Sequence, residues 1–386
     1  MNSPQIEIQI IAVIVAMACA IPGVFLVLRK MALISDAISH AILPGIVIGF
    51  FITQDLNSPL LILLAALTGV ITVVLVEFIQ KTGLVKEDTA IGLVFPVLFS
   101  IGVILISKNA NDIHLDVDAV LLGELAFAPF DRFMVEGADL GPKSLWVMGS
   151  ILIITISLLM LFFKELKVST FDAGLSSAIG ISPIIMHYGL MSVSSITVVG
   201  AFDAVGAILV VALMIAPAAT AYLLTEDLKK MIGLSLIFGA ISAISGYWAA
   251  NFLDASISGS IATTLGVIFL IVYLLAPKKG LISVLYRQKQ QKIEVSLITF
   301  LLHLNRHDEK SERHINHLRE HINWREVQAR TVVNLAEKNN LIEIKNGVVS
   351  LTEKGLTFTE KSLEYIVNNK DEKIEPMKED FFLFRG

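Results

Sequence analysis

Residues 32–46 read ALISDAISHAILPGI, an apolar run with the composition of a membrane-spanning helix apart from Asp36 and His40 near its middle. Residues four positions apart lie one above the other on one face of a helix. A charged side chain at the centre of a bilayer costs roughly 2.5–3.5 kcal/mol on insertion scales, so such residues line a bundle interior or a water-filled path. The stretch therefore predicts a membrane helix whose polar face has a function.

The two side chains also have the chemistry of metal ligands. A carboxylate oxygen together with an imidazole nitrogen suits Mn²⁺, Fe²⁺ or Zn²⁺ better than Ca²⁺ or Mg²⁺, which prefer shells made of oxygen alone. Two other interpretations stay open, a mutual hydrogen bond that joins helices and a proton relay. Pro44 and Gly45, one turn later, predict a helix break that frees backbone carbonyls. Gly206 and Pro217 are further predicted helix breaks.

The composition is that of an integral membrane protein with a soluble part attached. The chain has 386 residues, of which 55% are hydrophobic and 17% charged, and its mean hydropathy is +0.74. That is too apolar for a soluble protein of this length. Two of the apolar runs, 32–52 and 204–222, are less uniform than the rest, so we expect an all-α polytopic fold with eight or nine spans. The runs long enough to cross a core of about 30 Å are 6–28, 32–52, 58–80, 89–106, 145–163, 181–199, 204–222, 231–251 and 260–276.

Basic residues follow every second predicted span. By the positive-inside rule, these positions are cytoplasmic, which places the N-terminus outside and the C-terminal part inside. Counting from the first basic pair puts Asp36 and His40 in the inner half of the bilayer. The external loop at 107–144 holds 3 basic and 7 acidic residues, which either attract cations or are simply tolerated there. The basic positions are Arg29, Lys30, Lys81, Lys86, Lys164, Lys167, Lys229, Lys230, Lys278 and Lys279.

The C-terminal part differs from the rest in charge and in pattern. Residues 1–280 hold 13 Lys and Arg against 19 Asp and Glu, whereas residues 281–386 hold 17 against 16. The periodicity there predicts helices over 281–303, 311–321 and 327–338, and LIEIKNGVVSLTEKG predicts a β-hairpin that turns at Asn346-Gly347. We therefore expect a transmembrane domain at 1–280, a small α+β winged-helix cytoplasmic domain at 281–370 and a flexible tail at 371–386.

Histidines in this part suggest a second metal site. His314, His317 and His321 are spaced i, i+3 and i+7 and share one helical face, so one hypothesis is a cytoplasmic regulatory site, the alternative being solvated histidines. DNA binding is not expected, because a net charge of +1 is a poor electrostatic footprint for a nucleic-acid ligand. Glu77 is expected to reach water near the cytoplasmic end of its span.

The chain contains no GxxxxGK[ST] phosphate loop. We therefore expect it to be no enzyme in its own right. Uphill transport through it would need an ion gradient or a separate ATP-hydrolysing subunit.

Four sequence blocks occur in the order and at the spacing typical of one family. They are FLVLRKMALISDAISHAILPGIVIGFF, EDTAIGLVFPVLFSIGVILIS, FDAGLSSAIGI and VGAILVVALMIAPAATAYLLT. Over residues 6–277 the chain resembles the integral-membrane permeases of bacterial manganese, zinc and iron ABC importers. The C-terminal part resembles the DNA-binding winged helix of iron- and manganese-dependent repressors, which most members of the permease family lack.

The resemblance implies a transport function and its partners. It implies a homodimer or heterodimer of permeases in the bacterial plasma membrane, a cytoplasmic ATP-binding subunit and an extracytoplasmic metal-binding protein. It makes Asp36 and His40 candidate ligands in the translocation path, with Mn²⁺ first and Zn²⁺ or Fe²⁺ as alternatives, carried as substrate and not as a bound cofactor. The segment that docks on the ATPase would include Phe171, Asp172, Ala178 and Gly180.

Two other functional classes remain open from the sequence. A gradient-driven secondary metal transporter would work without an ATPase. A membrane-anchored, metal-responsive DNA-binding regulator would use its spans as a sensor.

Overall fold

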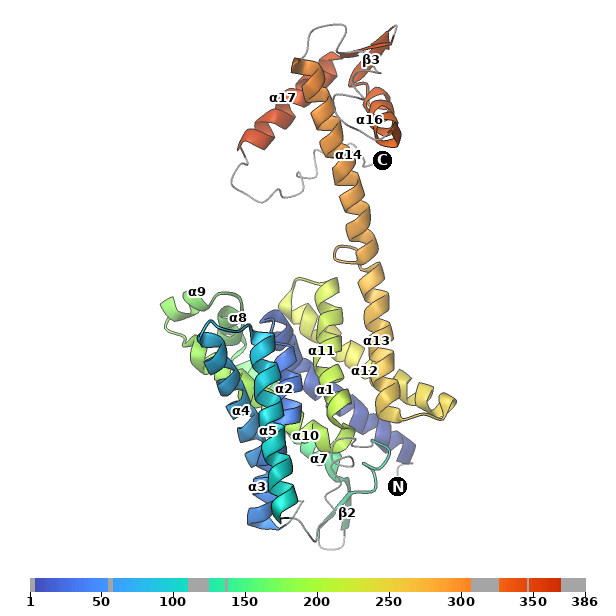
Figure 1. The fold of residues 1–386 in the computed structure, drawn as a ribbon. Coiled ribbons are helices and arrows are strands. Elements are labelled where there is room, and N and C mark those ends of the chain that lie inside the picture. The colour runs from blue at the N-terminus through green and yellow to red at the C-terminus, as the bar shows by residue number, and fades with distance from the viewer. Residues whose placement is uncertain are drawn as a thin grey trace. The chain divides into compact units, whose positions relative to one another are not determined.

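The computed structural model describes residues 4–54, 58–109, 125–135, 138–306, 326–345 and 347–368. The chain divides into two compact units, Met1–Leu281 and Ile282–Gly386. The first is a bundle of helices with a small β-hairpin at one end (Figure 1). Its helices are α1 (Pro4–Leu28), α2 (Leu33–Ala41), α3 (Leu43–Thr53), α4 (Pro59–Lys81), α5 (Glu87–Asn109), α7 (Lys143–Leu161), α8 (Phe163–Phe171), α9 (Ala173–Ala178), α10 (Pro183–Val205), α11 (Ala207–Leu224), α12 (Leu228–Leu253) and α13 (Ile257–Leu275).

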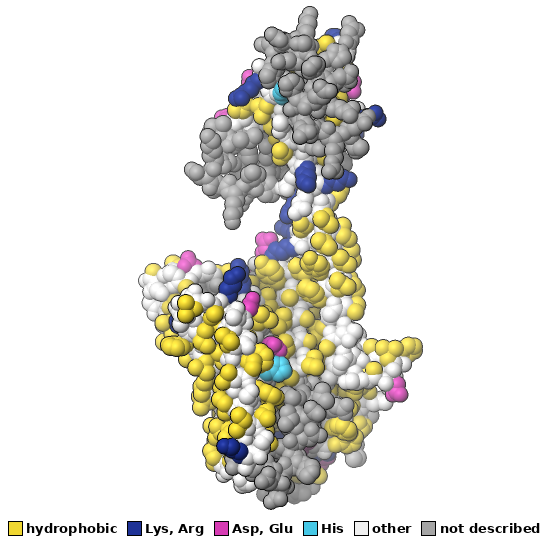
Figure 2. All heavy atoms as spheres, in the orientation of Figure 1, with side chains coloured by type: hydrophobic (Ala, Val, Ile, Leu, Met, Phe, Trp, Pro, Cys, Tyr) yellow, Lys and Arg dark blue, Asp and Glu magenta, His cyan; other side chains and the backbone are white. Residues whose placement is uncertain are grey.

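The bundle has the dimensions of a polytopic membrane protein. Within the described ranges, nine helices are long and apolar enough to cross a membrane, with α2 and α3 counted as one span. The outward faces of these helices are apolar: Figure 2 shows hydrophobic side chains covering α4 and α5, where Leu67, Ile71 and Val97 are exposed. A surface of this kind belongs in lipid. The prediction of a polytopic membrane fold built mainly of helices is confirmed.

Helices α1 and α11 form the centre of the bundle. Helix α1 packs against α7, α10, α11 and α12, and Val15, Cys19 and Phe25 on it are fully buried. The approach of α1 to α11 is very close, because a Cβ added at Gly23 would lie 1.9 Å from the carbonyl oxygen of Met214. Small residues at such contacts allow membrane helices to pack backbone against backbone.

The span that carries Asp36 and His40 is divided. Helix α2 ends at Ala41 and α3 begins at Leu43, with Ile42 between them. Pro44 has no N–H, so the carbonyl of His40 lacks the donor that a continuous helix would supply from position 44. Gly45 has a different role from the expected one: a Cβ there would lie 2.4 Å from the carbonyl oxygen of Leu64, so this glycine permits the contact between α3 and α4.

The other two predicted breaks have opposite outcomes. Gly206 separates α10 from α11 and has φ +80°, a conformation that glycine adopts without the steric cost of a Cβ. The break predicted at Pro217 is wrong, because α11 runs without interruption from Ala207 to Leu224. One missing backbone bond is tolerated where neighbouring helices hold the segment, and Pro217 is buried among them.

A β-hairpin precedes α7. Strands β1 (Arg132–Val135) and β2 (Ala138–Pro142) pair antiparallel with a register shift between Arg132 and Met134. The Arg132 guanidinium contacts Asp139 at 2.6 Å and Glu7 at 3.2 Å, and so joins the hairpin to α1. Its hydrogen bond to Asp139, with a second from the Gly141 N–H, holds the pKa of that carboxyl below its usual value. The hairpin lies within the loop predicted at 107–144.

The second unit has its own small core. Its elements are α14 (Leu281–Arg306), α16 (Glu326–Lys338), β3 (Ile342–Lys345), β4 (Val348–Leu351) and α17 (Glu353–Asn368). Phe300 and Leu301 of α14 pack with Val332 of α16 and Val349 of β4. The predicted hairpin is confirmed, since β3 and β4 pair antiparallel on either side of the turn, in which Gly347 has φ +79°. Helix α17 was not predicted. The expected helix at 311–321 lies outside the described residues, so the winged-helix assignment stays a prediction.

The contact at Gly23 gives a test of the bundle. Changing Gly23 to Ala forces α1 away from the backbone of α11, and overpacking of this kind costs about 1–3 kcal/mol. We expect a lower midpoint of thermal unfolding in detergent, measured by size-exclusion chromatography after heating. The matched control is Gly149→Ala on α7, where no atom lies within 4 Å of the added Cβ and the midpoint should stay or rise. Equal midpoints for both variants would contradict the close approach.

Candidate functional site

Asp36 and His40 form the one polar pair on the open face of α2. The neighbouring side chains of Ile34, Ala37 and Ile38 are buried against the bundle, where α2 contacts α4, α5, α10 and α11. Asp36 and His40 remain 43% and 36% exposed in the single chain. The helix therefore uses its apolar residues for packing and keeps the two ligand-type side chains accessible.

The distance within the pair fits one bound ion. Asp36 Oδ1 and His40 Nε2 lie 3.5 Å apart. Two ligands at about 2.1 Å from a metal with a tetrahedral angle between them are separated by about 3.4 Å. The His40 ring is held from one side by Phe95 of α5, with ring centroids 5.8 Å apart. The pair can thus hold a divalent ion between its two atoms with little movement.

Two ligands do not complete a coordination shell. Among the residues that the structure describes, no group of three His, Cys, Asp or Glu side chains gathers closely enough to hold an ion. Within the described residues, the pair therefore offers two side-chain ligands of these four types.

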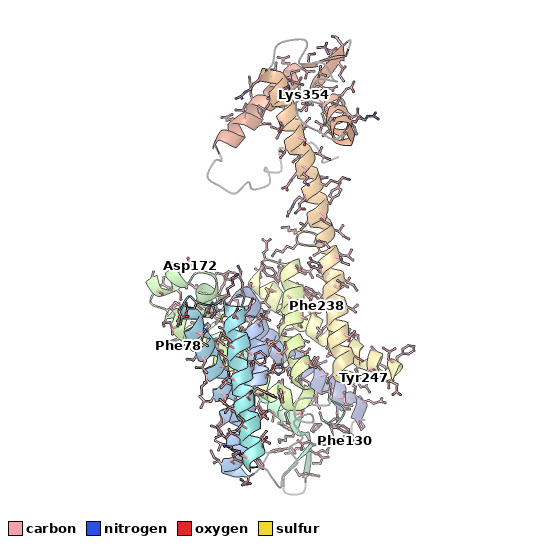
Figure 3. The ribbon with its side chains drawn as sticks, viewed as in Figure 1. Phe78, Phe130, Asp172, Phe238, Tyr247 and Lys354 are labelled. Atoms are coloured by element: carbon pink, nitrogen blue, oxygen red, sulfur yellow. The ribbon has the colours of Figure 1, made fainter. Side chains whose placement is uncertain are left out.

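The predicted coupling segment is a pair of short helices. Phe171 is the last residue of α8 and is 59% exposed. Asp172 is the N-cap of α9, and its Oδ1 accepts a hydrogen bond of 2.8 Å from the Leu175 N–H. Ala178 is the last residue of α9, and Gly180 has φ +85° in the turn that follows. Asp172 lies at the end of the membrane unit opposite to Phe130 and the β-hairpin (Figure 3).

Other predicted positions lie elsewhere. His314, His317 and His321 are outside the described residues, so the regulatory site stays a prediction. Asp36 and His40 are brought together by α2 alone. The coupling segment is formed by α8 and α9, separately from the pair.

The structure also corrects the expectation for Glu77. Its side chain is only 14% exposed and contacts His187 and Lys81, while the Tyr188 hydroxyl donates to it at 2.9 Å. Sequence reasoning missed this cluster, to which Arg29 also belongs. The sequence feature that could have revealed the cluster is the presence of ionisable residues at one end of three different helices, α1, α4 and α10.

Comparisons with known proteins agree on one family. Residues 6–276 match the model of the ABC 3 transport family. The chain is 44% identical to the zinc transport system membrane protein TroD of Treponema pallidum over 365 residues, which is 94% of this chain and 99% of that protein. Since the first unit has 281 residues, this match extends into the second unit.

Two further relatives match the membrane unit. The manganese transport system membrane protein MntD of Bacillus subtilis is 43% identical over 271 residues, which is 70% of this chain and 92% of that protein. A solved structure described as PsaBC from Streptococcus pneumoniae in complex with Fab has a TM-score of 0.60 at 31% identity, and the match covers 71% of this chain and 92% of that chain. The resemblance inferred from the four sequence blocks is confirmed: this chain belongs to the ABC 3 transport family.

Proposed function

We propose that this chain is the membrane-spanning permease subunit of an ATP-driven importer for divalent transition metal ions, in a bacterial plasma membrane. The observation that carries the proposal is the Asp36–His40 pair, 3.5 Å apart on the open face of a divided membrane helix. Relatives named for zinc and manganese transport support the substrate class. Mn²⁺ is the first candidate, with Zn²⁺ and Fe²⁺ as alternatives for the same ligand pair.

The open face of the pair calls for a second permease. Polar side chains this exposed would be costly in hydrocarbon, so a partner chain or a water-filled path between two copies covers them. A homodimer or a heterodimer would supply the missing ligands across the interface. The ion then passes between two copies that alternate between an outward and an inward opening.

The energy for transport comes from a separate ATP-binding subunit, since the chain belongs to the ABC 3 transport family and has no phosphate loop in its own sequence. The exposed side chains of Phe171, Leu175 and Ile179 give α8 and α9 an apolar surface suited to docking that subunit. An extracytoplasmic metal-binding protein delivers the ion on the other side. The second unit is a separate cytoplasmic domain in this proposal, with the winged-helix fold expected for 281–370.

Replacement of either ligand tests the pathway. Asp36→Ala and His40→Ala should each reduce uptake of radioactive Mn²⁺ or Zn²⁺ into whole cells at least tenfold, because each variant removes half of the pair. Asp254→Asn is the matched control, since it removes a carboxylate from a left-handed residue at the end of α12, where Asn is well tolerated. Wild-type uptake in both alanine variants would end the assignment of the site. Uptake that survives ATP depletion while the ion gradient is intact would favour a secondary transporter.

The cap of α9 tests the coupling segment. Asp172→Ala removes the hydrogen bond to the Leu175 N–H, and loss of an N-cap costs about 0.5–2 kcal/mol of local helix stability. We expect less ATP-binding subunit to co-purify with this variant. Asp227→Ala removes the equivalent cap of α12, where Oδ1 accepts from the Lys230 N–H at 3.0 Å, and should leave co-purification unchanged. Equal losses in the two variants would mean that the effect is general destabilisation.

A further inference from the structure

A cluster of polar side chains joins four helices at the end of the membrane unit where α8 and α9 lie. Figure 3 labels Asp172 and Phe78 at this end, and Glu77 precedes Phe78 in α4. The side chains are linked by a continuous set of hydrogen bonds and ion pairs. We call them the clamp: Arg29, Glu77, Ser169, Thr170, His187 and Tyr188.

Arg29 forms hydrogen bonds with the helices on both sides of the predicted coupling segment. Its Nη2 donates to Ser169 Oγ at 2.9 Å and to Thr170 Oγ1 at 3.1 Å, on the last turn of α8. Its Nη1 donates to His187 Nδ1 at 3.3 Å, on the second turn of α10. One guanidinium thus reaches the helix before the segment and the helix after it, which a planar fork with five donors can do.

The hydrogen bonds fix the protonation of His187. A guanidinium has donors only, so Nδ1 accepts and the ring proton is on Nε2. Nε2 is in close contact with Glu77 Oε1, while the Tyr188 hydroxyl donates to Oε2. Both carboxylate oxygens of Glu77 therefore contact side chains of α10, which joins α4 to α10. Glu77 and His187 are only 14% and 18% exposed, which shields these bonds from water.

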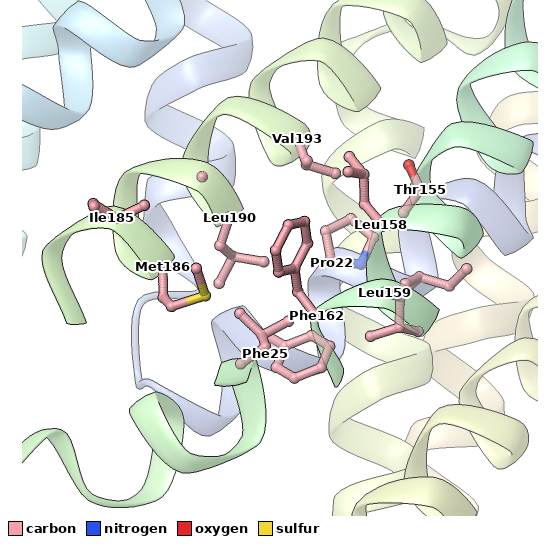
Figure 4. Close-up of a pocket in the computed structure, with 13 residues that line it drawn as sticks. Pro22, Phe25, Thr155, Leu158, Leu159, Phe162, Ile185, Met186, Leu190 and Val193 are labelled. Carbon is pink, nitrogen blue, oxygen red and sulfur yellow. The ribbon is translucent and has the colours of Figure 1, made fainter. Parts of the chain in front are cut away.

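The apolar packing next to the clamp is incomplete. An apolar cavity of about 270 Å³ lies between α1, α7, α8 and α10. Figure 4 shows Phe25, Phe162 and Leu190 around it, and Phe25 precedes Arg29 by one turn. Apolar contacts therefore leave room for α8 and α10 to shift against α1. The polar contacts of the clamp therefore add to the apolar packing of Phe25 and Leu190 in holding these helices together.

Arg29 is also close in sequence to the metal pair. Lys30 follows it in a left-handed turn with φ +62°, and the Met31 N–H donates to the Leu26 carbonyl at 2.9 Å. Helix α2 begins at Leu33, so three residues separate Arg29 from the helix that carries Asp36 and His40. The clamp and the start of α2 are therefore joined by a connection of only three residues, 30–32.

We propose that the clamp couples the position of α8–α10 to the position of α2, so that movement imposed by ATP hydrolysis changes the access to Asp36 and His40. This inference rests on the proposed transport function. Arg29 and Glu77 are positioning residues, because neither lies in the metal pair. Their loss should separate ATP hydrolysis from transport without removing either.

The test measures metal transport and ATP hydrolysis together in the full transporter, reconstituted in liposomes with its ATP-binding subunit and the delivery protein. For Arg29→Gln and Glu77→Gln we expect ATP hydrolysis within twofold of wild type and at least fivefold less Mn²⁺ or Zn²⁺ transported per ATP. Arg29→Lys should stay uncoupled, because one ammonium keeps the charge but does not bridge α8 and α10. Tyr188→Phe removes a single bond to Glu77 and should give a smaller loss.

Lys81→Gln is the matched control, because this exposed lysine contacts Glu77 at 3.6 Å without joining two helices, and its transport per ATP should equal that of wild type. Wild-type coupling in Arg29→Gln and Glu77→Gln would overturn the inference and leave the transport function intact. Loss of the ATP-binding subunit from these variants would also overturn it, since the clamp would then only support docking. Absence of metal-stimulated hydrolysis in the wild-type transporter would contradict the proposed function itself.

Discussion

A polar side chain in hydrocarbon must be covered by protein or by water, and this constraint organises the membrane unit. Helix α2 buries Ile34, Ala37 and Ile38 against four neighbouring helices. Asp36 and His40 lie on its remaining face, which is open in the single chain. The apolar side of α2 is therefore fully packed, whereas Asp36 and His40 have no protein covering their open side among the described residues of the single chain. This arrangement fits the proposed transport of ions between two copies.

The bundle combines a rigid part and a loosely packed part. At Gly23 the backbones of α1 and α11 are in direct contact, so those helices have no room to slide. At the other face of α1, an apolar cavity lies beside Phe25, and Arg29 one turn later forms hydrogen bonds with α8 and α10. Hydrogen bonds exchange partners more readily than interlocked side chains repack, because packed interiors do not deform continuously. The proposed coupling therefore places the movement in α8 and α10 and not in α11.

The spans of the membrane unit were predictable from sequence, because hydrophobic length acts locally along the chain. The i, i+4 spacing alone brought Asp36 and His40 together, and the Asn346-Gly347 pair alone predicted the β3–β4 hairpin. The Arg29–His187–Glu77 contacts were missed because they join residues 110 to 158 positions apart, and no local pattern encodes such pairs. The helix break predicted at Pro217 was wrong for a related reason. Whether a proline breaks a membrane helix depends on the packing of neighbouring helices around it, and Pro217 is buried within α11.

The position of Asp36 and His40 near the start of α2 determines how much of the transmembrane voltage an ion would cross to reach them. A helix rises about 1.5 Å per residue, so Asp36 and His40 lie about 4.5 and 10.5 Å along the axis from Leu33, where α2 begins. In the proposed orientation α2 begins at the cytoplasmic side of a core about 30 Å thick, so an ion that enters from outside crosses more than half of the transmembrane field before it reaches His40. For two charges at 100 mV, that is about 2–3 kcal/mol. In this proposal the membrane voltage itself contributes to how often the pair is occupied, before any ATP is hydrolysed.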